Sequence, residues 1–188
     1  MVKIEIRKAV SEDYLLVSDL GSESFYETWR PVNSEEDIQK YITDAFNPLN
    51  IKADIENDAV NTFFIAIEGK KAVGYIKLRT DRSQDEFKEE NAIELERLYV
   101  LKEWQEKKVG KALMDEGLKM AVDQHYNWMW LGVATENFKA LKFYKQYGFV
   151  IFGEKIFKLG DAVDTDYLMK KKLVEYLFLI IIKLLLLQ

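Results

Sequence analysis

Two glutamates near the end of a predicted strand are the first side chains whose spacing suggests chemistry. Glu94 and Glu96 lie in the run Glu94-Leu-Glu-Arg-Leu-Tyr-Val100, which we predict to be a strand. Because strand side chains alternate between faces, Glu94, Glu96, Leu98 and Val100 are expected to share one face. Two adjacent carboxylates could exchange protons with a substrate. Two solvent-facing charges on an edge strand would give the same pattern, so the pair alone decides nothing.

A lysine-rich turn follows that strand. The run Gln105-Glu-Lys-Lys-Val-Gly110-Lys-Ala112 stands between the strand and an amphipathic segment. A strand–loop–helix turn directs several backbone N–H groups to one point, and the helix dipole makes that point attractive to an anion. Lys107, Lys108 and Lys111 add charge that suits a pyrophosphate. An ordinary solvated turn would have the same composition.

A third segment combines a phenol with an aromatic helix face. It reads Asn137-Phe-Lys-Ala140-Leu-Lys-Phe143-Tyr144-Lys-Gln-Tyr147-Gly148-Phe149. Helical spacing places its aromatic residues on neighbouring rows, and Gly148 is a typical helix end. A buried helix face explains part of this pattern. It does not explain why a phenol accompanies a glycine-ended helix behind an anion-binding turn.

The rest of the chain supplies elements that position these segments. Alternation predicts strands over residues 4–6, 63–68, 72–79, 93–101, 128–133, 150–159 and 166–173, and helical spacing predicts helices over 11–30, 34–46, 48–56, 109–124 and 138–147. We expect the first helix to break at Gly21, and residues 81–90 to form an acidic loop. No repeat or linker divides the chain. We therefore expect one mixed α/β domain over residues 1–173, with a mostly antiparallel central sheet flanked by helices.

Composition excludes several classes of function. The 188 residues include no cysteine, which removes disulfides, thiolate metal sites and cysteine nucleophiles. The net charge of −5 argues against nucleic-acid binding and weakly favours cationic substrates. No ligand cluster for a metal is visible. The first residues alternate apolar and charged side chains without the apolar run of a signal peptide, so nothing indicates export and we expect a cytoplasmic protein.

The last residues are almost wholly aliphatic. Residues 174–188 are interrupted only by a few polar side chains, among them Glu175 and Lys183. A membrane-spanning helix needs about twenty apolar residues, so we do not expect a span. We expect instead a segment outside the transfer site, covered by its own domain or by a second copy in a homo-oligomer. A tail anchor stays open as an alternative, because Lys170, Lys171 and Lys172 flank the run.

Together, the three segments resemble the acetyl-coenzyme A site of the GNAT superfamily of N-acetyltransferases. The resemblance rests on Leu98-Tyr-Val, on Gln105-x-x-x-x-Gly110-Lys-Ala-Leu and on Asn137-x-x-Ala-x-x-Phe-Tyr-x-x-x-Gly-Phe149. Their order and spacing match, and the element order fits from about Ile4 to Leu173. The stretches Trp130-Leu-Gly-Val133, Phe157-Lys-Leu-Gly-Asp161 and Thr165-Asp166-Tyr-Leu-Met169 are similar to the PaiA-type branch, bacterial enzymes associated with spermidine and spermine.

The resemblance implies a role for each matching residue toward acetyl-coenzyme A. The backbone of Leu98, Tyr99 and Val100 would pair with the pantetheine arm, and Asn137 would bond to it. The pyrophosphate would be held by the loop residues Gln105, Glu106, Lys107, Lys108, Val109, Gly110 and Lys111. Ala140 and Phe143 would line the same site, and Tyr144 would protonate the departing thiolate. Lys108 stands where the family usually has glycine, so either it takes an ordinary loop conformation or cofactor affinity is reduced.

The group that would accept the proton from the attacking amine is less clearly indicated by the sequence. Glu96 is the first choice as the base and Glu94 the second, with a water chain as an alternative. His125 follows a predicted helix end and is interpreted as a surface residue. The resemblance implies direct attack by a primary amine, with a polyamine as acceptor. A protein N-terminal or small-amine acetyltransferase, and a regulatory module that binds acetyl-coenzyme A with little turnover, stay open as alternatives.

Overall fold

The computed structural model describes residues 3–87, 90–159 and 162–173. The aliphatic segment 174–188 lies outside the described residues, so the prediction that it is covered stays a prediction. Within the described ranges, no helix is both long enough and apolar enough to cross a membrane.

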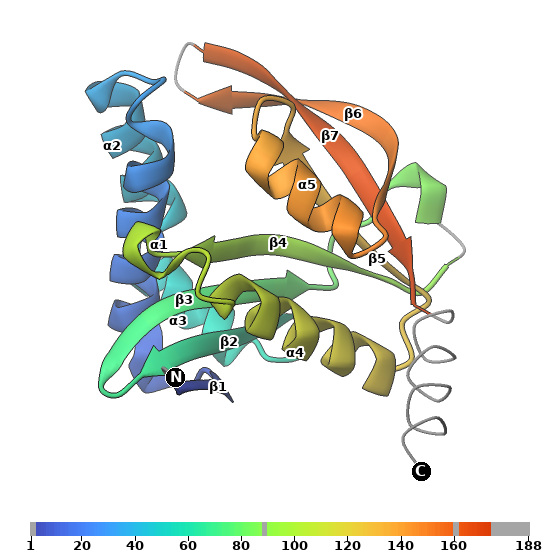
Figure 1. Cartoon of the computed structure of the whole chain (residues 1–188), viewed down its shortest axis with the longest axis horizontal. Helices are drawn as coiled ribbons and strands as arrows, with labels where there is room; N and C mark the ends of the chain where they lie inside the picture. Colours follow the sequence, from blue (N-terminus) through green and yellow to red (C-terminus); the bar gives the residue numbers. More distant parts are fainter. Residues whose placement is uncertain (1–2, 88–89, 160–161, 174–188) are drawn as a thin grey trace.

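A seven-stranded sheet runs through the molecule in the order β1-β2-β3-β4-β5-β7-β6 (Figure 1). The strands are β1 Ile4–Lys8, β2 Asn61–Glu68, β3 Lys71–Arg79, β4 Ala92–Val100, β5 Trp128–Ala134, β6 Val150–Leu159 and β7 Ala162–Lys172. The helices are α1 Tyr14–Trp29, α2 Glu35–Ala45, α3 Pro48–Glu56, α4 Val109–Asp123 and α5 Phe138–Gln146. All neighbouring strands are antiparallel except β4 and β5, which are parallel. The predicted fold class, a mixed α/β domain with a mostly antiparallel sheet, is therefore confirmed.

Helices cover both faces of the sheet. Helices α4 and α5 pack their apolar sides on one face, where Leu113, Leu118 and Leu141 join a core cluster with residues of β2 to β5. Helices α1 and α3 pack on the other face, where Val17 and Ile51 meet side chains of β2 and β3. Figure 1 shows α1, α2 and α3 gathered on one side and α4 and α5 on the other.

The first helix does not break at Gly21 as the sequence predicted. Helix α1 is continuous from Tyr14 to Trp29, and Gly21 is buried within it. A Cβ atom at this position would lie 2.5 Å from the ring of Phe46 and 3.0 Å from the hydroxyl of Tyr75. The glycine therefore serves close packing, and its cost to the helix is offset by that contact.

The two parallel strands separate soon after they meet. Strands β4 and β5 pair only from Ala92–Trp128 to Glu94–Trp130. Farther along, β4 stays paired with β3 up to Val100, and β5 stays paired with β7 up to Ala134. The two strands thus leave a wedge-shaped gap in the sheet, here called the wedge. Along this gap, the edges of β4 and β5 that face each other have no strand partner among the described residues. Backbone polar groups there are available to a ligand.

A bulge in β4 corrects the predicted alternation of faces. Lys77 pairs with Arg97 and Leu78 pairs with Leu95, so Glu96 is the extra residue. Leu95, Leu98 and Val100 consequently face the α4 side of the sheet, where they join one cluster. The prediction that Glu94 and Glu96 share a face with Leu98 and Val100 is wrong. A bulge shifts the alternation by one residue, and the sequence pattern carries no mark of it.

Candidate active site

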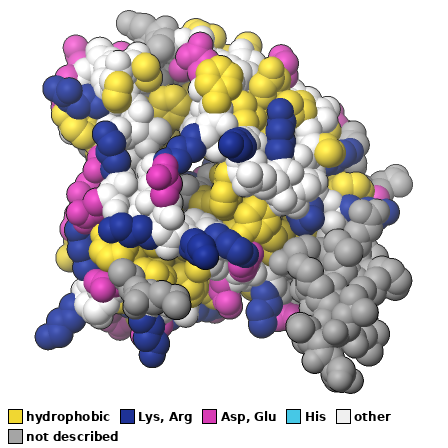
Figure 2. Space-filling model, viewed as in Figure 1, with side chains coloured by type: hydrophobic (Ala, Val, Ile, Leu, Met, Phe, Trp, Pro, Cys, Tyr) yellow, Lys and Arg dark blue, Asp and Glu magenta, His cyan; other side chains and the backbone are white. Residues whose placement is uncertain are grey.

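A cavity of about 1050 Å³ fills the wedge between β4 and β5. Its walls come from α1, α2 and β4 on one side and from the loop before α4, α5, β5, β6 and β7 on the other. Figure 2 shows the face on which it opens, with Lys and Arg side chains around a central hollow and hydrophobic side chains beside it. All three predicted catalytic residues, Tyr144, Glu96 and Glu94, line this cavity.

Most of the predicted cofactor residues also line the cavity. They are Leu98, Tyr99, Val100, Gln105, Glu106, Lys108, Gly110, Lys111, Asn137, Ala140, Phe143 and Tyr144. Lys107 and Val109 do not line it. The ammonium of Lys107 lies 4.3 Å from the ring centre of Trp104, and Val109 is 1% exposed in the core. His125, exposed after the end of α4, does not line it either.

The loop before α4 adopts a backbone that glycine favours. Lys108 has φ 65° and ψ 10°, in the left-handed region, at the N-cap of α4. Of the two alternatives that the sequence left open, the ordinary loop conformation is not the one found, and a non-glycine residue in the left-handed region costs roughly 1–2 kcal/mol. Ala112 N–H donates to the carbonyl of Lys108 at 3.0 Å, while no side chain caps the helix. The first N–H groups of α4 therefore point toward the cavity mouth without intrahelical acceptors.

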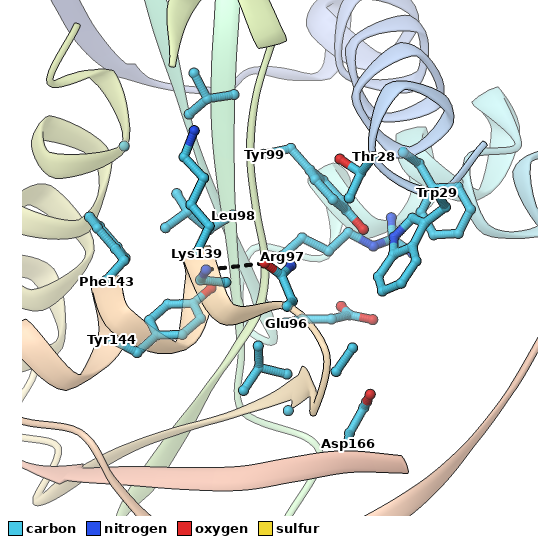
Figure 3. Close-up of a pocket in the computed structure, with 18 of the residues that line it drawn as sticks. Thr28, Trp29, Glu96, Arg97, Leu98, Tyr99, Lys139, Phe143, Tyr144 and Asp166 are labelled. Carbon is cyan, nitrogen blue, oxygen red and sulfur yellow. Dashed lines mark hydrogen bonds between the residues drawn. The ribbon is translucent and has the colours of Figure 1, made fainter. Parts of the chain in front are cut away.

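Side chains tie this loop to its neighbours. The amide of Gln105 donates to the carbonyl of Val100 at 3.2 Å. The ammonium of Lys139, from the first turn of α5, donates to Gln105 at 2.9 Å and to Glu106 at 3.3 Å. No sequence pattern singles out Lys139, which lies more than thirty residues from its partners. These contacts tie the loop before α4 to α5 and to the end of β4, and Figure 3 marks a hydrogen bond of Lys139 with a dashed line.

Charges of both signs line the cavity, in different proportions along it. Lysines predominate in the loop after β4 and on α4 and α5, and the acidic Glu27 and Glu106 also line the cavity: the lysines are Lys102, Lys108, Lys111, Lys139 and Lys142. Acidic residues of β4 and β7 line it together with the basic Arg82, Arg97 and Lys155: they are Glu94, Glu96, Asp164 and Asp166. The lysine-rich part suits a polyphosphate, and the acidic part suits a cation.

The cavity also has the features that coenzyme A requires. A helix N-terminus with surrounding lysines can hold the pyrophosphate, and the unpaired edge of β4 can hold the amides of pantetheine. The side-chain oxygen of Asn137 accepts from Ala140 N–H at 3.1 Å and caps α5, which leaves its NH₂ group for a ligand. Gly110 stands at the helix start with only ordinary contact for an added Cβ, 3.7 Å from Val100. The residues present therefore fit the cofactor.

Tyr144 carries a protected hydroxyl at the cavity wall. Tyr144 is 8% exposed, and its ring packs edge-on against Phe143 and Phe149. Burial raises the pKa of Tyr144 well above its ordinary value, so the phenol keeps its proton at neutral pH. Among the described residues, no side chain forms a hydrogen bond with this hydroxyl in the structure. Figure 3 shows the ring reaching in from α5, across the cavity from Trp29 and Thr28 of α1.

Glu96 is surrounded by cations. Its carboxylate lies 2.6 Å from the ammonium of Lys77, 3.3 Å from Arg79 and 3.5 Å from Arg82. Lys77 is 1% exposed and also contacts Asp54 of α3 at 2.6 Å. Burial opposes ionisation of Glu96, but the charges of Lys77 and its other basic neighbours prevail and lower its pKa. A carboxylate held this way is a weak proton acceptor.

Glu94 has the opposite environment. It is 3% exposed, and its Oε2 atom has no hydrogen-bond partner in the described structure. The nearest cation, Arg82, is 3.7 Å away. Burial raises the pKa of Glu94, which brings it nearer to that of a useful general base. The geometry therefore favours Glu94 over Glu96, the reverse of the order that the sequence suggested.

An aromatic wall from α1, α2 and β6 closes the far side of the cavity. The rings of Phe25 and Tyr41 stack with centres 4.3 Å apart, and Tyr41 meets Phe157 edge-on at 5.9 Å. The guanidinium of Arg97 lies 4.6 Å from the ring centre of Phe46. Sequence reasoning did not assign these residues to the site. For Phe25 and Tyr41, helical periodicity identifies an apolar helix face without saying what that face packs against.

Comparison with known proteins agrees with this site. Residues 18–149 match the model of the acetyltransferase (GNAT) family. An uncharacterized N-acetyltransferase of Lactobacillus delbrueckii subsp. lactis is 32% identical over 174 residues, covering 93% of this chain and 100% of that protein. The spermidine N(1)-acetyltransferase of Thermoplasma acidophilum is 28% identical over 174 residues, covering 91% and 98% of the two chains.

Solved structures show the same fold. The PaiA N-acetyltransferase of Thermoplasma acidophilum, crystallised in complex with coenzyme A, superposes with a TM-score of 0.76 at 27% identity, over 90% of this chain and 99% of that one. The putative acetyltransferase yncA of Salmonella typhimurium, solved with acetyl-coenzyme A, has a TM-score of 0.65 at 18% identity, over 91% and 94% of the two chains. The second likeness supports the fold alone. The chain belongs to the GNAT family and is an acetyl-coenzyme A-dependent N-acetyltransferase.

Proposed function

We propose that this enzyme acetylates a primary amino group of a polyamine such as spermidine or spermine. The observation that carries the proposal is the acidic lining supplied by β4 and β7 beside an aromatic wall, a combination that suits a flexible cation with methylene segments. The relative in Thermoplasma acidophilum, a spermidine N(1)-acetyltransferase, supports the same class of acceptor.

The residues of the chain divide the chemistry between two walls. Acetyl-coenzyme A supplies a thioester carbonyl and a thiolate leaving group. Glu94 accepts a proton from the acceptor ammonium, directly or through water, so that the amine becomes a nucleophile. The backbone N–H groups on the unpaired edge of β4 stabilise negative charge on the carbonyl oxygen. Tyr144 holds the proton that the departing sulfur takes up, and the cations around Glu96 keep that carboxylate ionised.

Release of coenzyme A with a panel of amines tests the proposal. We expect turnover with spermidine and spermine to exceed turnover with a monoamine of similar length. The apparent affinity for the polyamines should weaken more steeply as salt rises, because long-range attraction is screened within about 8 Å at physiological ionic strength.

Two other outcomes would replace the proposal. Preference for peptides, or equal salt response for monoamines and polyamines, would indicate a protein N-terminal or small-amine acetyltransferase. Binding of acetyl-coenzyme A without turnover of any amine would indicate a regulatory module.

A further inference from the structure

Asp166 is a buried carboxylate that the proposed chemistry does not use. It lies on β7 opposite Ala134, at the end of β5, and lines the cavity while being only 8% exposed. Its ion pair within the described residues is with Lys155, and Nζ and Oδ2 are 3.7 Å apart. That separation is longer than a charge-assisted hydrogen bond. Asp166 is therefore largely removed from water, and its ion pair with Lys155 is a long one.

A carboxylate in this position favours the arrival of a cation. Burying an ionised group costs free energy unless a counter-charge compensates it. Burial raises the pKa of Asp166, although the charge of Lys155 opposes the shift. A ligand that brings an ammonium group to Asp166 would compensate the free energy that its carboxylate loses when it is removed from water.

Lys155 occupies the space next to this carboxylate. It lies on β6 directly opposite Asp166, and its side chain is 40% exposed. Its Cε and Nζ atoms lie over β5 at Gly132, where an added Cβ would be 2.7 Å from both. The absence of a side chain at Gly132 thus leaves room for the ammonium at the cavity floor. Because Lys155 is partly exposed, it can move into solvent at low cost.

The charge of Lys155 also acts on Glu94, whose ionisation it favours. One ammonium group therefore lies within the influence of two carboxylates that line the same cavity, one on β4 and one on β7. A diamine or polyamine presents a second ammonium at a fixed distance along its chain, whereas a monoamine does not.

We infer that Asp166 binds a second ammonium group of the acceptor, and that Lys155 holds this place until the acceptor displaces it. The inference rests on the proposed function and assigns the selection of polyamines over monoamines to Asp166. Glu94 would then face the amino group that reacts, and Asp166 a distal one.

Three variants test the inference through the ratio of kcat/KM for spermidine to that for n-butylamine. Asp166→Asn keeps the shape and removes the charge, and we expect the ratio to fall at least about tenfold, the effect of losing one charge-assisted hydrogen bond. Lys155→Met removes the competing ammonium, and we expect the KM for spermidine to fall. Asp123→Asn makes the same change in net charge on α4, beside Lys119 and away from the cavity lining, and should leave the ratio within about twofold.

The outcomes separate the inference from the proposed function. Equal losses for both amines in Asp166→Asn would mean that Asp166 only supports the fold, and the inference would be wrong while the polyamine proposal stood. A wild-type enzyme that acetylates n-butylamine but not spermidine would overturn both. If Asp166→Asn does not fold, Lys155→Met decides, since an unchanged or raised KM for spermidine contradicts the displacement.

Discussion

Replacing Tyr144 by phenylalanine should lower turnover about 10²–10⁴-fold, the usual contribution of a general acid. The ring packs between Phe143 and Phe149, and those contacts remain in the variant. Affinity for acetyl-coenzyme A should therefore change little. Steady-state kinetics and calorimetry on the same preparation measure the two effects separately.

Tyr147→Phe is the matched control. Tyr147 lies near the end of the same helix, and its hydroxyl contacts Asp115 at 2.8 Å outside the cavity lining. We expect its turnover to stay within about threefold of wild type. If Tyr144→Phe turns over as fast as Tyr147→Phe, with the chemical step shown to limit the rate, the phenol of Tyr144 serves packing alone.

The pH dependence of Tyr144 follows from its burial. Because its pKa is raised, the hydroxyl remains protonated throughout the neutral and mildly alkaline range. Loss of the acid form of Tyr144 should therefore not reduce the rate below about pH 10, the ordinary tyrosine pKa.

The second large effect concerns the two glutamates of β4. Glu94→Gln should lower kcat/KM for an amine about 10²–10³-fold, because the amide cannot accept the proton. In the wild type, the rate should fall as pH decreases through the raised pKa of Glu94, since only the ionised form accepts a proton. That acid limb should disappear from the residual activity of Glu94→Gln. A full pH–rate profile of both proteins measures it.

Glu96→Gln should act mainly on stability. The variant removes one of two carboxylates that neutralise the buried Lys77, and breaking such a pair costs up to about 3–5 kcal/mol. The pKa of Glu96 is lower in the folded protein than in the unfolded chain, so its stabilising contribution is present above the unfolded pKa. That contribution is lost as pH falls through the folded pKa.

Urea denaturation at several pH values distinguishes these roles. Glu96→Gln should lose less stability in acid than wild type does, while retaining a larger share of activity than Glu94→Gln at neutral pH. A greater catalytic loss in Glu96→Gln, in protein shown to be folded, would restore Glu96 as the base.

Much of this fold could be predicted from sequence because its signals are local. Alternation over β2 and β3, helical spacing over α4 and α5, and the glycine that ends α5 each depend on neighbouring residues. Gly148 has φ 83°, in the left-handed region in which glycine commonly ends a helix. The residues that we propose to hold the cofactor come from three such segments in order, which is why the sequence predicts them together.

The features that escaped prediction depend on contacts distant in sequence. The bulge at Glu96 lies where β4 pairs with β3, and it changes the face on which the residues after it lie. A lysine in an alternating strand is usually exposed, yet Lys77 is buried and forms ion pairs with Asp54 and Glu96. Gly21 lies inside the continuous helix α1, where a larger side chain would collide with the ring of Phe46 from the segment after α2.

We propose that acetyl-coenzyme A binds in the wedge between β4 and β5, with its pyrophosphate at the start of α4. Calorimetric titration of acetyl-coenzyme A into wild type and Ala140→Trp tests this placement. Ala140 lines the cavity from α5, so a tryptophan there should fill the space without a change of charge. We expect one cofactor per chain in wild type, with affinity that falls as salt rises, and at least about a hundredfold weaker binding in the folded variant. Equal binding to both proteins, or none to wild type at millimolar ligand, would show that the cofactor does not bind in this wedge.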